Sequence, residues 1–182
     1  LWINLMKHLL AVGITAIAFE TVEVNGALPL LTPMSDIAGR LSIQIGTHLL
    51  HAPQGGKGIL LGGLPAAKRG NVVVLGAGVA GGNAASVAAA LGSNVTVFDK
   101  KHDKLTEMRM LGPNVTALHP YSQSIEEAVQ QADLLIGAVL IPGAPAPVLV
   151  TKEMVSTMEP GSVIIDIAVD QGGCIETIHS TT

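Results

Sequence analysis

Charged and aromatic residues are both scarce in this chain of 182 residues. Charged side chains make up 13% of the sequence and aromatic side chains 2%, so the core must be built from Val, Ile, Leu and Ala. The formal net charge is −4, and no basic cluster with interleaved aromatic residues occurs, which argues against a nucleic-acid-binding protein. Because 48% of the residues are hydrophobic, we also expect surfaces that another part of a protein covers.

The chain also lacks a second cysteine and a long hydrophobic run. A single cysteine, Cys174, excludes an intramolecular disulfide framework and fits a reducing compartment. A membrane span needs about 18 apolar residues, whereas the longest candidate, residues 9–19, is interrupted by Gly13 and Thr15. No secretory signal peptide is recognisable. We therefore expect a soluble protein with neither a membrane nor a nucleic-acid partner.

A short apolar strand followed by a glycine turn stands near the middle of the chain. Residues 71–75 suit a strand buried on both faces, and residues 82–91 are rich in helix-forming alanine. In a dinucleotide-binding turn, Gly76 would allow the tight turn, Gly78 would let the backbone approach a pyrophosphate, and Gly81 would let helix and strand pack closely. A plain strand–helix connection has the same pattern, so the turn alone leaves both interpretations open. The residues expected at the phosphates are Gly76, Gly78, Val79, Ala80 and Gly81.

An acidic residue at the end of the next strand favours the dinucleotide-binding interpretation. Residues 94–98 form a second β-branched strand that ends in Asp99, close to the spacing at which an acid meets the adenosine ribose. A carboxylate there binds both ribose hydroxyls and repels a 2′-phosphate, so NAD is the expected cofactor rather than NADP. Lys100 and Lys101 weaken that preference, and an ordinary polar strand end is the alternative.

Strands and helices alternate through the rest of the chain. This pattern predicts an α/β fold, a Rossmann-type doubly wound parallel sheet with helices on both faces. Ligands bind such sheets at the carboxyl ends of the strands, here residues 76–81, 139–143 and 170–173. The expected strands are residues 71–75, 94–98, 114–118, 133–139 and 163–167, and the expected helices are residues 82–91, 104–110, 125–130 and 151–158, the last capped by Thr151.

The first fifty residues have a different organisation. We expect a helix at residues 4–10, a strand at residues 15–19 and a turn at Asn25-Gly26. A long helix follows at residues 35–50, with Ser35 and Asp36 as cap candidates. Its apolar residues Ile37, Leu41, Ile45 and Leu49 recur on one face. We predict three parts: residues 1–31 as the tail of an amino-terminal domain, residues 32–52 as an interdomain linking helix, and residues 53–182 as an NAD-binding domain.

Two further features, a histidine pair and two glycine-rich stretches, give no clear sign of a metal or phosphate site. His48 and His51 have a spacing compatible with metal ligation, but no third ligand is apparent, so solvated helix residues are favoured and no metal is expected. The glycine-rich stretches 54–58 and 61–65 are not a P-loop, because the order of Gly, Lys and Ser or Thr is wrong. Each is either a loop beside a cofactor or a plain connecting turn.

Asp170 is the ionisable residue placed to reach a nicotinamide ring. A carboxylate there could orient a substrate ammonium or relay a proton, and a turn aspartate before Gly172 is the alternative. Cys174 lies nearby, but without a recognisable base it is interpreted as a buried small residue. Asp133 and Asp166 are interpreted as structural.

Five stretches resemble the bacterial L-alanine dehydrogenases. They are residues 30–40 (LLTPMSDIAGR), 58–63 (GILLGG), 76–81 (GAGVAG), 136–143 (IGAVLIPG) and 166–174 (DIAVDQGGC). The resemblance covers nearly the whole chain, and its last two stretches are far more specific than the glycine turn. It implies reversible NAD-dependent oxidative deamination of L-alanine to pyruvate and ammonia by a cytoplasmic protein, usually a hexamer.

The resemblance also implies roles for individual residues. Asp170 matches the catalytic aspartate, Asp99 the ribose acid, and Lys104 an adenosine-side contact. The family holds the substrate carboxylate with an Arg and a Lys and uses a His as acid/base, all in an amino-terminal domain that we expect this chain to lack apart from its tail. Residues 121–122 depart from the family's usual loop, so contacts there are in doubt. The remaining expected cofactor contacts are Ser35 at the hinge, Val139 and Leu140 beside the nicotinamide, and Ile167.

Two alternatives remain at this point. The NAD-binding subunit of proton-translocating transhydrogenase resembles this sequence too, but that family typically has Glu at the position of Asp170 and a longer insertion before the fourth strand. A non-catalytic NAD-binding or regulatory module is the second alternative.

Overall fold

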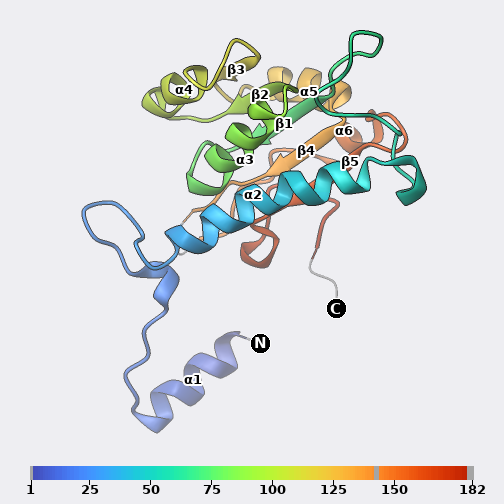
Figure 1. Ribbon diagram of the computed structural model, residues 1–182. Helices are drawn as coiled ribbons and strands as arrows, with labels where there is room; N and C mark the ends of the chain where they lie inside the picture. Colours follow the sequence, from blue (N-terminus) through green and yellow to red (C-terminus); the bar gives the residue numbers. More distant parts are fainter. Residues whose placement is uncertain (1, 142–143, 180–182) are drawn as a thin grey trace.

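The computed structural model describes residues 2–141 and 144–179, and its centre is a five-stranded parallel sheet in the order β3-β2-β1-β4-β5 (Figure 1). This sheet confirms the predicted α/β, Rossmann-type fold. β1 lies in the middle and pairs with β2 on one side and β4 on the other, so the strand order reverses there. The strands are β1 (Asn71–Leu75), β2 (Asn94–Phe98), β3 (Val115–Leu118), β4 (Leu134–Gly137) and β5 (Val163–Asp166).

Helices cover both faces of the sheet, as predicted. Val72 and Val74 of β1 point into one hydrophobic core, and Val73 and Leu75 point into the other. The first core is covered by α2 (Thr32–Leu49), α3 (Val79–Ala90) and α4 (His102–Arg109), and the second by α5 (Ser122–Gln131) and α6 (Lys152–Ser156). The absence of polar alternation in β1 is therefore explained by burial on both sides.

Element types were predicted better than element ends. All five strands of the sheet and the four helices that follow β1 are present, but α3 and α5 begin three residues earlier than expected, at Val79 and Ser122. Glycine and serine lower helix propensity without excluding the first turn, where tertiary packing decides. The side chain of Thr151 accepts a hydrogen bond from the backbone N–H of Met154 at 3.3 Å, which confirms its predicted role as a cap.

The predicted caps of α2 are wrong. The helix begins at Thr32, its N-cap residue is Leu31, and no side chain caps it, so Ser35 and Asp36 lie inside the first turns. Pro33 fits the first turn because the N–H that proline lacks has no partner there. Asp36 instead accepts a hydrogen bond from the side-chain amide of Asn83 on α3 at 2.7 Å.

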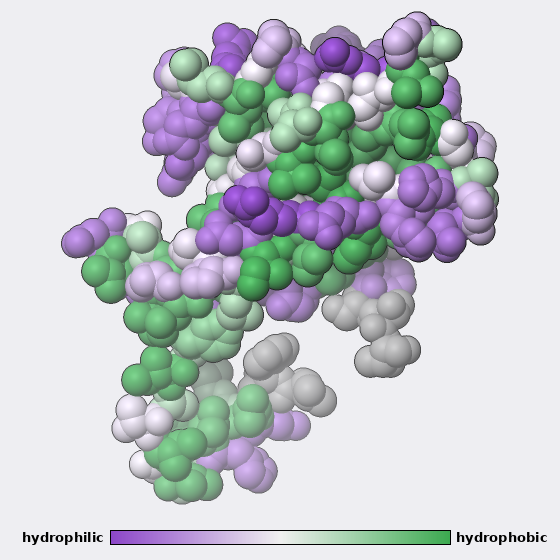
Figure 2. Space-filling model, viewed as in Figure 1, coloured by the Kyte–Doolittle hydropathy of each residue, from purple (hydrophilic) through white to green (hydrophobic). Residues whose placement is uncertain are grey.

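The helix α2 packs on α3 through its small residues. A Cβ atom at Gly39 would lie 2.1 Å from the carbonyl oxygen of Ala80, so only glycine allows this approach. The opposite stripe of Ile37, Leu41, Ile45 and Leu49 is exposed by between 38% and 60%. Figure 2 shows apolar surface along the lower side of this helix. The division into a linking helix and an NAD-binding domain stays a prediction, although α2 contributes directly to the core of the sheet.

The first thirty residues stand apart from the sheet (Figure 1). The predicted helix is present as α1 (Trp2–Val12), and the Asn25-Gly26 turn is present with positive φ angles of 52° and 76°. The strand predicted at residues 15–19 is wrong: the segment pairs with no other part of the described chain, and Ile17 is 77% exposed. A β-branched run becomes a strand only when a neighbour accepts its hydrogen bonds. No helix in residues 2–141 or 144–179 is both long and apolar enough to span a membrane.

Candidate functional site

The turn between β1 and α3 has the geometry expected of a dinucleotide-binding turn. Gly76 has a φ angle of +96°, which favours glycine, and its N–H donates to the carbonyl oxygen of Phe98 at 2.8 Å. A Cβ atom at Gly81 would lie 1.8 Å from the carbonyl oxygen of Gly76. One glycine therefore makes the turn and the other allows the helix to close against it.

Gly78 differs from these two glycines because the space beside it is open. A Cβ atom there would meet nothing within 4 Å. Gly78 is the N-cap of α3, no side chain caps the helix, and the first helical hydrogen bond is donated by Gly82 to the carbonyl oxygen of Gly78. The N–H groups of Val79, Ala80 and Gly81 precede that bond and face out of the helix end, where an anion is favoured. This cradle fits the pyrophosphate of a dinucleotide.

The carboxylate of Asp99 lies directly beside this turn. One oxygen accepts a hydrogen bond from the backbone N–H of Ala77 at 2.7 Å, and the other accepts from the N–H of Lys101 at 2.8 Å. A carboxylate has about four acceptor positions, so roughly two remain for another donor. The half-buried Asp99 is thus held by the backbone with part of its acceptor capacity free, as binding to ribose hydroxyls requires.

Lys104 lies near Asp99 but is already paired. Its ammonium contacts the carboxylate of Glu107 at 2.7 Å on the same helix. The hydrogen bond to Glu107 raises the pKa of Lys104 despite its partial burial, and the charges of Glu107, Asp103 and Asp99 raise it further. Lys104 is therefore paired with another residue of α4. Its expected contact with the adenosine side of a cofactor stays a prediction.

The ends of β4 and β5 lie at the same edge of the sheet as the glycine turn. A Cβ atom at Gly76 would lie 2.7 Å from the carbonyl oxygen of Ala138, next to the half-buried Val139 and the exposed Leu140. The N–H of Ile167 donates to the carbonyl oxygen of Gly137 at 2.8 Å. The predicted loop residues Pro142 and Gly143 lie outside the described residues.

Asp170 follows β5 at this edge, in the short 3-10 helix η3 (Val169–Gln171). Its side chain is exposed, and Gly172 and Gly173 follow it with φ angles of +103° and +63°. Ser35 precedes Asp36 on α2, and the Asp36–Asn83 hydrogen bond ties that end of α2 to the first turns of α3. The structure therefore brings the predicted site residues from α2, β1, β2, β4 and β5 to one side of the molecule.

Cys174 and Asp166 lie beneath this surface. Cys174 is fully buried, and burial together with the negative charge of Asp166 raises the pKa of its thiol to about 12. Such a thiol is not a nucleophile at neutral pH, which agrees with its interpretation as a buried small residue. Asp166 accepts two backbone hydrogen bonds, one of them from Cys174, so its structural interpretation also agrees with the geometry.

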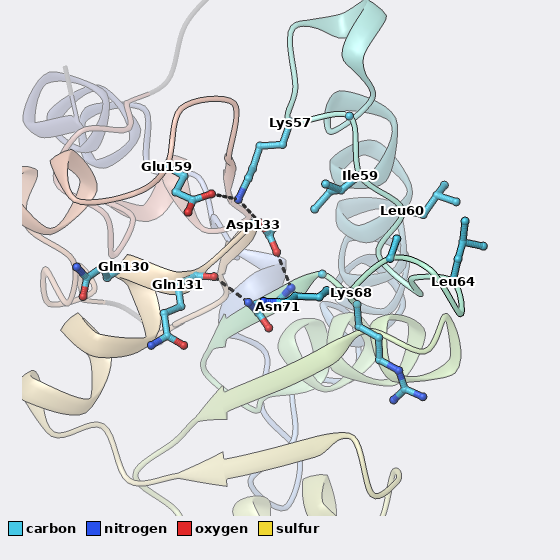
Figure 3. A pocket seen from close by; sticks show the side chains of 14 residues that line it. Lys57, Ile59, Leu60, Leu64, Lys68, Asn71, Gln130, Gln131, Asp133 and Glu159 are labelled. Atoms are coloured by element: carbon cyan, nitrogen blue, oxygen red, sulfur yellow. Dashed lines mark hydrogen bonds and ion pairs between the residues drawn. The ribbon is translucent and has the colours of Figure 1, made fainter.

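The opposite edge of the sheet carries an ion cluster and a cavity of about 850 Å³ (Figure 3). Lys57 bonds to both Asp133 and Glu159, and Asp133 also accepts from the N–H of Asn71 at 2.7 Å. Burial alone would lower the pKa of Lys57, but hydrogen bonds and charge from the two carboxylates raise it. Sequence reasoning missed Lys57 and Glu159 because their partners are distant along the chain.

The glycine-rich stretches 54–58 and 61–65 belong to this opposite edge. Lys57 donates its N–H to the carbonyl oxygen of Gly161 at 3.1 Å, and a Cβ atom at Gly62 would lie 2.3 Å from the carbonyl oxygen of Leu91. These contacts favour connecting turns over a loop beside a cofactor. The rings of His48 and His51 lie 6.1 Å apart, and the residues that the structure describes contain no group of three potential metal ligands.

Comparison with known proteins identifies the family. Residues 42–182 match the family model described as "Alanine dehydrogenase/PNT, C-terminal domain". The alanine dehydrogenase of Bacillus subtilis (strain 168) is 54% identical over 172 residues, which are 93% of this chain and 46% of the relative. The chain thus spans about half the length of the curated relatives it matches.

Solved structures give the same result. A structure described as L-alanine dehydrogenase superposes with a TM-score of 0.89 and 55% identity, covering 98% of this chain and 50% of the other. The transhydrogenase from Sinorhizobium meliloti superposes with a TM-score of 0.71 and 31% identity, covering 82% of this chain and 43% of the other. Together with the family model and the five-stranded sheet, these matches show that the chain belongs to the alanine dehydrogenase family.

Proposed function

We propose that this chain is the NAD-binding half of an L-alanine dehydrogenase, which interconverts L-alanine with pyruvate and ammonia. The observation that carries the proposal is the pairing of the glycine turn with Asp99, whose carboxylate accepts from the N–H of Ala77 at 2.7 Å. This contact supports a site in which phosphates and ribose are bound side by side. The match of the family model over residues 42–182 supports the same conclusion.

The residues of the carboxyl edge have separate tasks in this proposal. The N–H groups at the start of α3 bind the pyrophosphate, and Asp99 binds the adenosine ribose and disfavours a 2′-phosphate. Val139, Leu140 and Ile167 form the wall beside the nicotinamide. Ser35 and Lys104 are further expected contacts, at the hinge and on the adenosine side.

The redox chemistry comes from the cofactor and the substrate is oriented by protein groups. When bound, NAD supplies the acceptor for the hydride that leaves the α-carbon of alanine. Asp170, exposed at the end of β5, orients the substrate ammonium or relays a proton. We expect the groups that hold the substrate carboxylate, and the acid/base histidine, to lie in the half of the parent protein that corresponds to the unmatched part of its relatives.

Localisation and assembly follow from the same proposal. We expect a cytoplasmic parent protein that assembles as a homo-oligomer, a hexamer by the resemblance. The apolar stripe of α2, with Ile37 60% exposed, supports a covered surface in the assembled protein.

Two assays of alanine-dependent NADH formation test the proposal. Hydride transfer needs the reacting atoms held about 3–3.5 Å apart, and that positioning contributes roughly 7–11 kcal/mol to lowering the barrier. We therefore expect this chain to bind cofactor without turnover. In the full-length protein, Asp170→Asn should lower kcat severely and spare NADH binding, because it removes charge near the reacting carbon only. Robust turnover by this chain alone would contradict the placement of the substrate-binding groups in the other half, and robust turnover by full-length Asp170→Asn would contradict the role of Asp170.

The transhydrogenase subunit remains a second candidate, since the solved transhydrogenase shares 31% identity with this chain. The aspartate at position 170 and the higher identity to alanine dehydrogenases favour the dehydrogenase. A non-catalytic NAD-binding module would bind NADH as well, and alanine-dependent NADH formation by the unmodified full-length protein distinguishes the two.

A further inference from the structure

One buried carboxylate at the carboxyl edge has no part in the proposed chemistry. Asp166 ends β5, is 8% exposed and is the one charged residue within the five strands. Burying a carboxylate is costly unless hydrogen bonds compensate it. Its hydrogen bonds therefore indicate what the side chain is for.

The two carboxylate oxygens of Asp166 bind the two ends of one loop. One oxygen accepts from the N–H of Ala168 at 3.0 Å, and the other accepts from the N–H of Cys174 at 2.7 Å. Between these two residues lies the 3-10 helix Val169–Gln171, which carries Asp170. This side chain thus closes the loop across its base, next to the backbone hydrogen bond from the N–H of Gly173 to the carbonyl oxygen of Ala168 at 3.0 Å.

The surroundings of Asp166 are shaped to hold this carboxylate in one place. A Cβ atom at Gly137, its neighbour on β4, would lie 2.8 Å from the carboxyl carbon, and a Cβ atom at Gly173 would lie 2.8 Å from one oxygen. Gly173 also has a φ angle of +63°. Glycines therefore border the carboxylate on both sides, and a side chain at either position would press on it. Asparagine fits but turns an N–H₂ group toward one of the two N–H donors.

We propose that Asp166 is a positioning residue that holds Asp170 at the nicotinamide side of the site. The inference rests on the proposed function, because Asp170 has a task only if a dinucleotide is bound at this edge. Asp166 itself touches neither cofactor nor substrate. It acts by fixing both ends of the 168–174 loop, so that the carboxylate of Asp170 stands at a constant place beside the ring.

The ratio of the affinities for NAD⁺ and NADH measures whether the carboxylate of Asp170 lies beside the nicotinamide ring. The nicotinamide ring is positively charged in NAD⁺ and neutral in NADH, so a nearby carboxylate favours NAD⁺. Titrations of the chain with NAD⁺, NADH and ADP-ribose should show Asp170→Asn shifting the NAD⁺ to NADH affinity ratio toward NADH by about fivefold or more. Asp166→Asn should shift it the same way by about threefold or more, with no added effect in the double variant.

Asp133→Asn is the matched control, because Asp133 is also a buried aspartate that accepts a backbone N–H, but at the opposite edge. It should leave the ratio unchanged, and ADP-ribose, which lacks the nicotinamide, should bind all variants alike. Gly173→Ala, which presses on the same carboxylate from the other side, should reproduce the shift.

Each result decides a different claim. A wild-type chain that binds none of the three ligands would end the proposed function, and an unchanged ratio in Asp170→Asn would end the role of Asp170 and this inference with it. A shift in Asp170→Asn without one in Asp166→Asn and Gly173→Ala would overturn the positioning role alone. Loss of ADP-ribose binding in Asp166→Asn would overturn it too, because the carboxylate would then support the whole fold rather than this loop.

Discussion

The two edges of the sheet use aspartate in different ways. At the carboxyl edge, Asp99 and Asp166 accept hydrogen bonds from backbone N–H groups of the loops, and no cation of the described residues forms an ion pair with them. At the amino edge, Asp133 is paired with Lys57. The cavity of about 850 Å³ lies at the amino edge, although the glycine turn and Asp170 lie at the other.

The aspartates at the two edges therefore have different roles, in ligand binding at one edge and in stability at the other. A carboxylate held by backbone groups keeps acceptor capacity and fixes a loop, which suits a site that receives a ligand. A carboxylate paired with a lysine has its charge compensated within the protein and supports the fold. The size of a cavity therefore does not locate the site, and the hydrogen-bond partners of the aspartates do. Changes at the carboxyl edge should alter affinity, and changes at the amino edge should alter stability.

The largest effect is expected for Gly78→Val. The valine side chain fits the protein, since nothing lies within 4 Å of the Cβ position, but it fills the space in front of the helix end. NADH affinity should fall by at least about a hundredfold, measured by calorimetric titration, with the circular dichroism spectrum intact. Gly82→Ala is the control, because its Cβ atom would lie 3.5 Å from the end of Met108. Unchanged affinity in Gly78→Val would reduce the turn to a plain connection.

Asp99→Ser should have the next largest effect. It removes a charged acceptor beside the turn, so NADH binding should weaken by about 1.5–3 kcal/mol and NADPH binding should become easier. Asp103→Ser, an exposed acid on the first turn of α4, is the matched control and should change neither affinity. If NADPH bound no better to the Asp99→Ser chain than to the wild type, the carboxylate would not be the group that selects the cofactor.

A smaller effect, on stability alone, is expected for Asp133→Asn. The amide keeps an acceptor for the N–H of Asn71 but loses the charge that pairs with Lys57. The free energy of unfolding in urea should fall by about 1–2 kcal/mol, while NADH affinity stays constant. Glu126→Gln on the exposed face of α5 should leave both quantities unchanged. A parallel loss of NADH affinity would break the division between the two edges.

The smallest effect is expected from titrating the ion cluster. The hydrogen bond and charge of Lys57 lower the pKa of Glu159 below its ordinary value of 4.5. A lowered pKa stabilises the folded state above pH 4.5, and this contribution disappears as the pH falls through the lowered value. Because Glu159 is exposed, water screens most of the interaction. Wild type and Glu159→Gln, compared by urea unfolding, should differ slightly at neutral pH and converge in acid.

Lys57 titrates at the other end of the range. Its pKa is raised above 10.5, so its contribution is complete below that value and is lost as the pH rises through the raised one. Lys57→Met should therefore remove stability at neutral pH but change little in strong alkali. A difference between wild type and Lys57→Met that persists at high pH would mean that the lysine acts through packing rather than charge.

Local pattern and spacing predicted the sheet and the edge at which the candidate site residues lie. Three valines in β1 and the spacing from Gly81 to Asp99 are features that a single strand–turn–helix–strand unit dictates. The segment at residues 15–19 has a similar β-branched pattern but no neighbouring strand, and pairing is not visible in a local pattern. The same holds for Lys57, whose partner Asp133 is 76 residues away. Burial also depends on what a helix packs against. Gly39 faces α3 and Gly46 faces the sheet, so the larger apolar residues of α2 stay exposed.

Titration of this chain with NADH and with NADPH tests most directly whether the carboxyl edge is an NAD site. We expect measurable binding of NADH and clearly weaker binding of NADPH, because the carboxylate of Asp99 is held beside the glycine turn and would repel a 2′-phosphate. Equal affinities for the two cofactors, or no binding of either, would contradict this expectation.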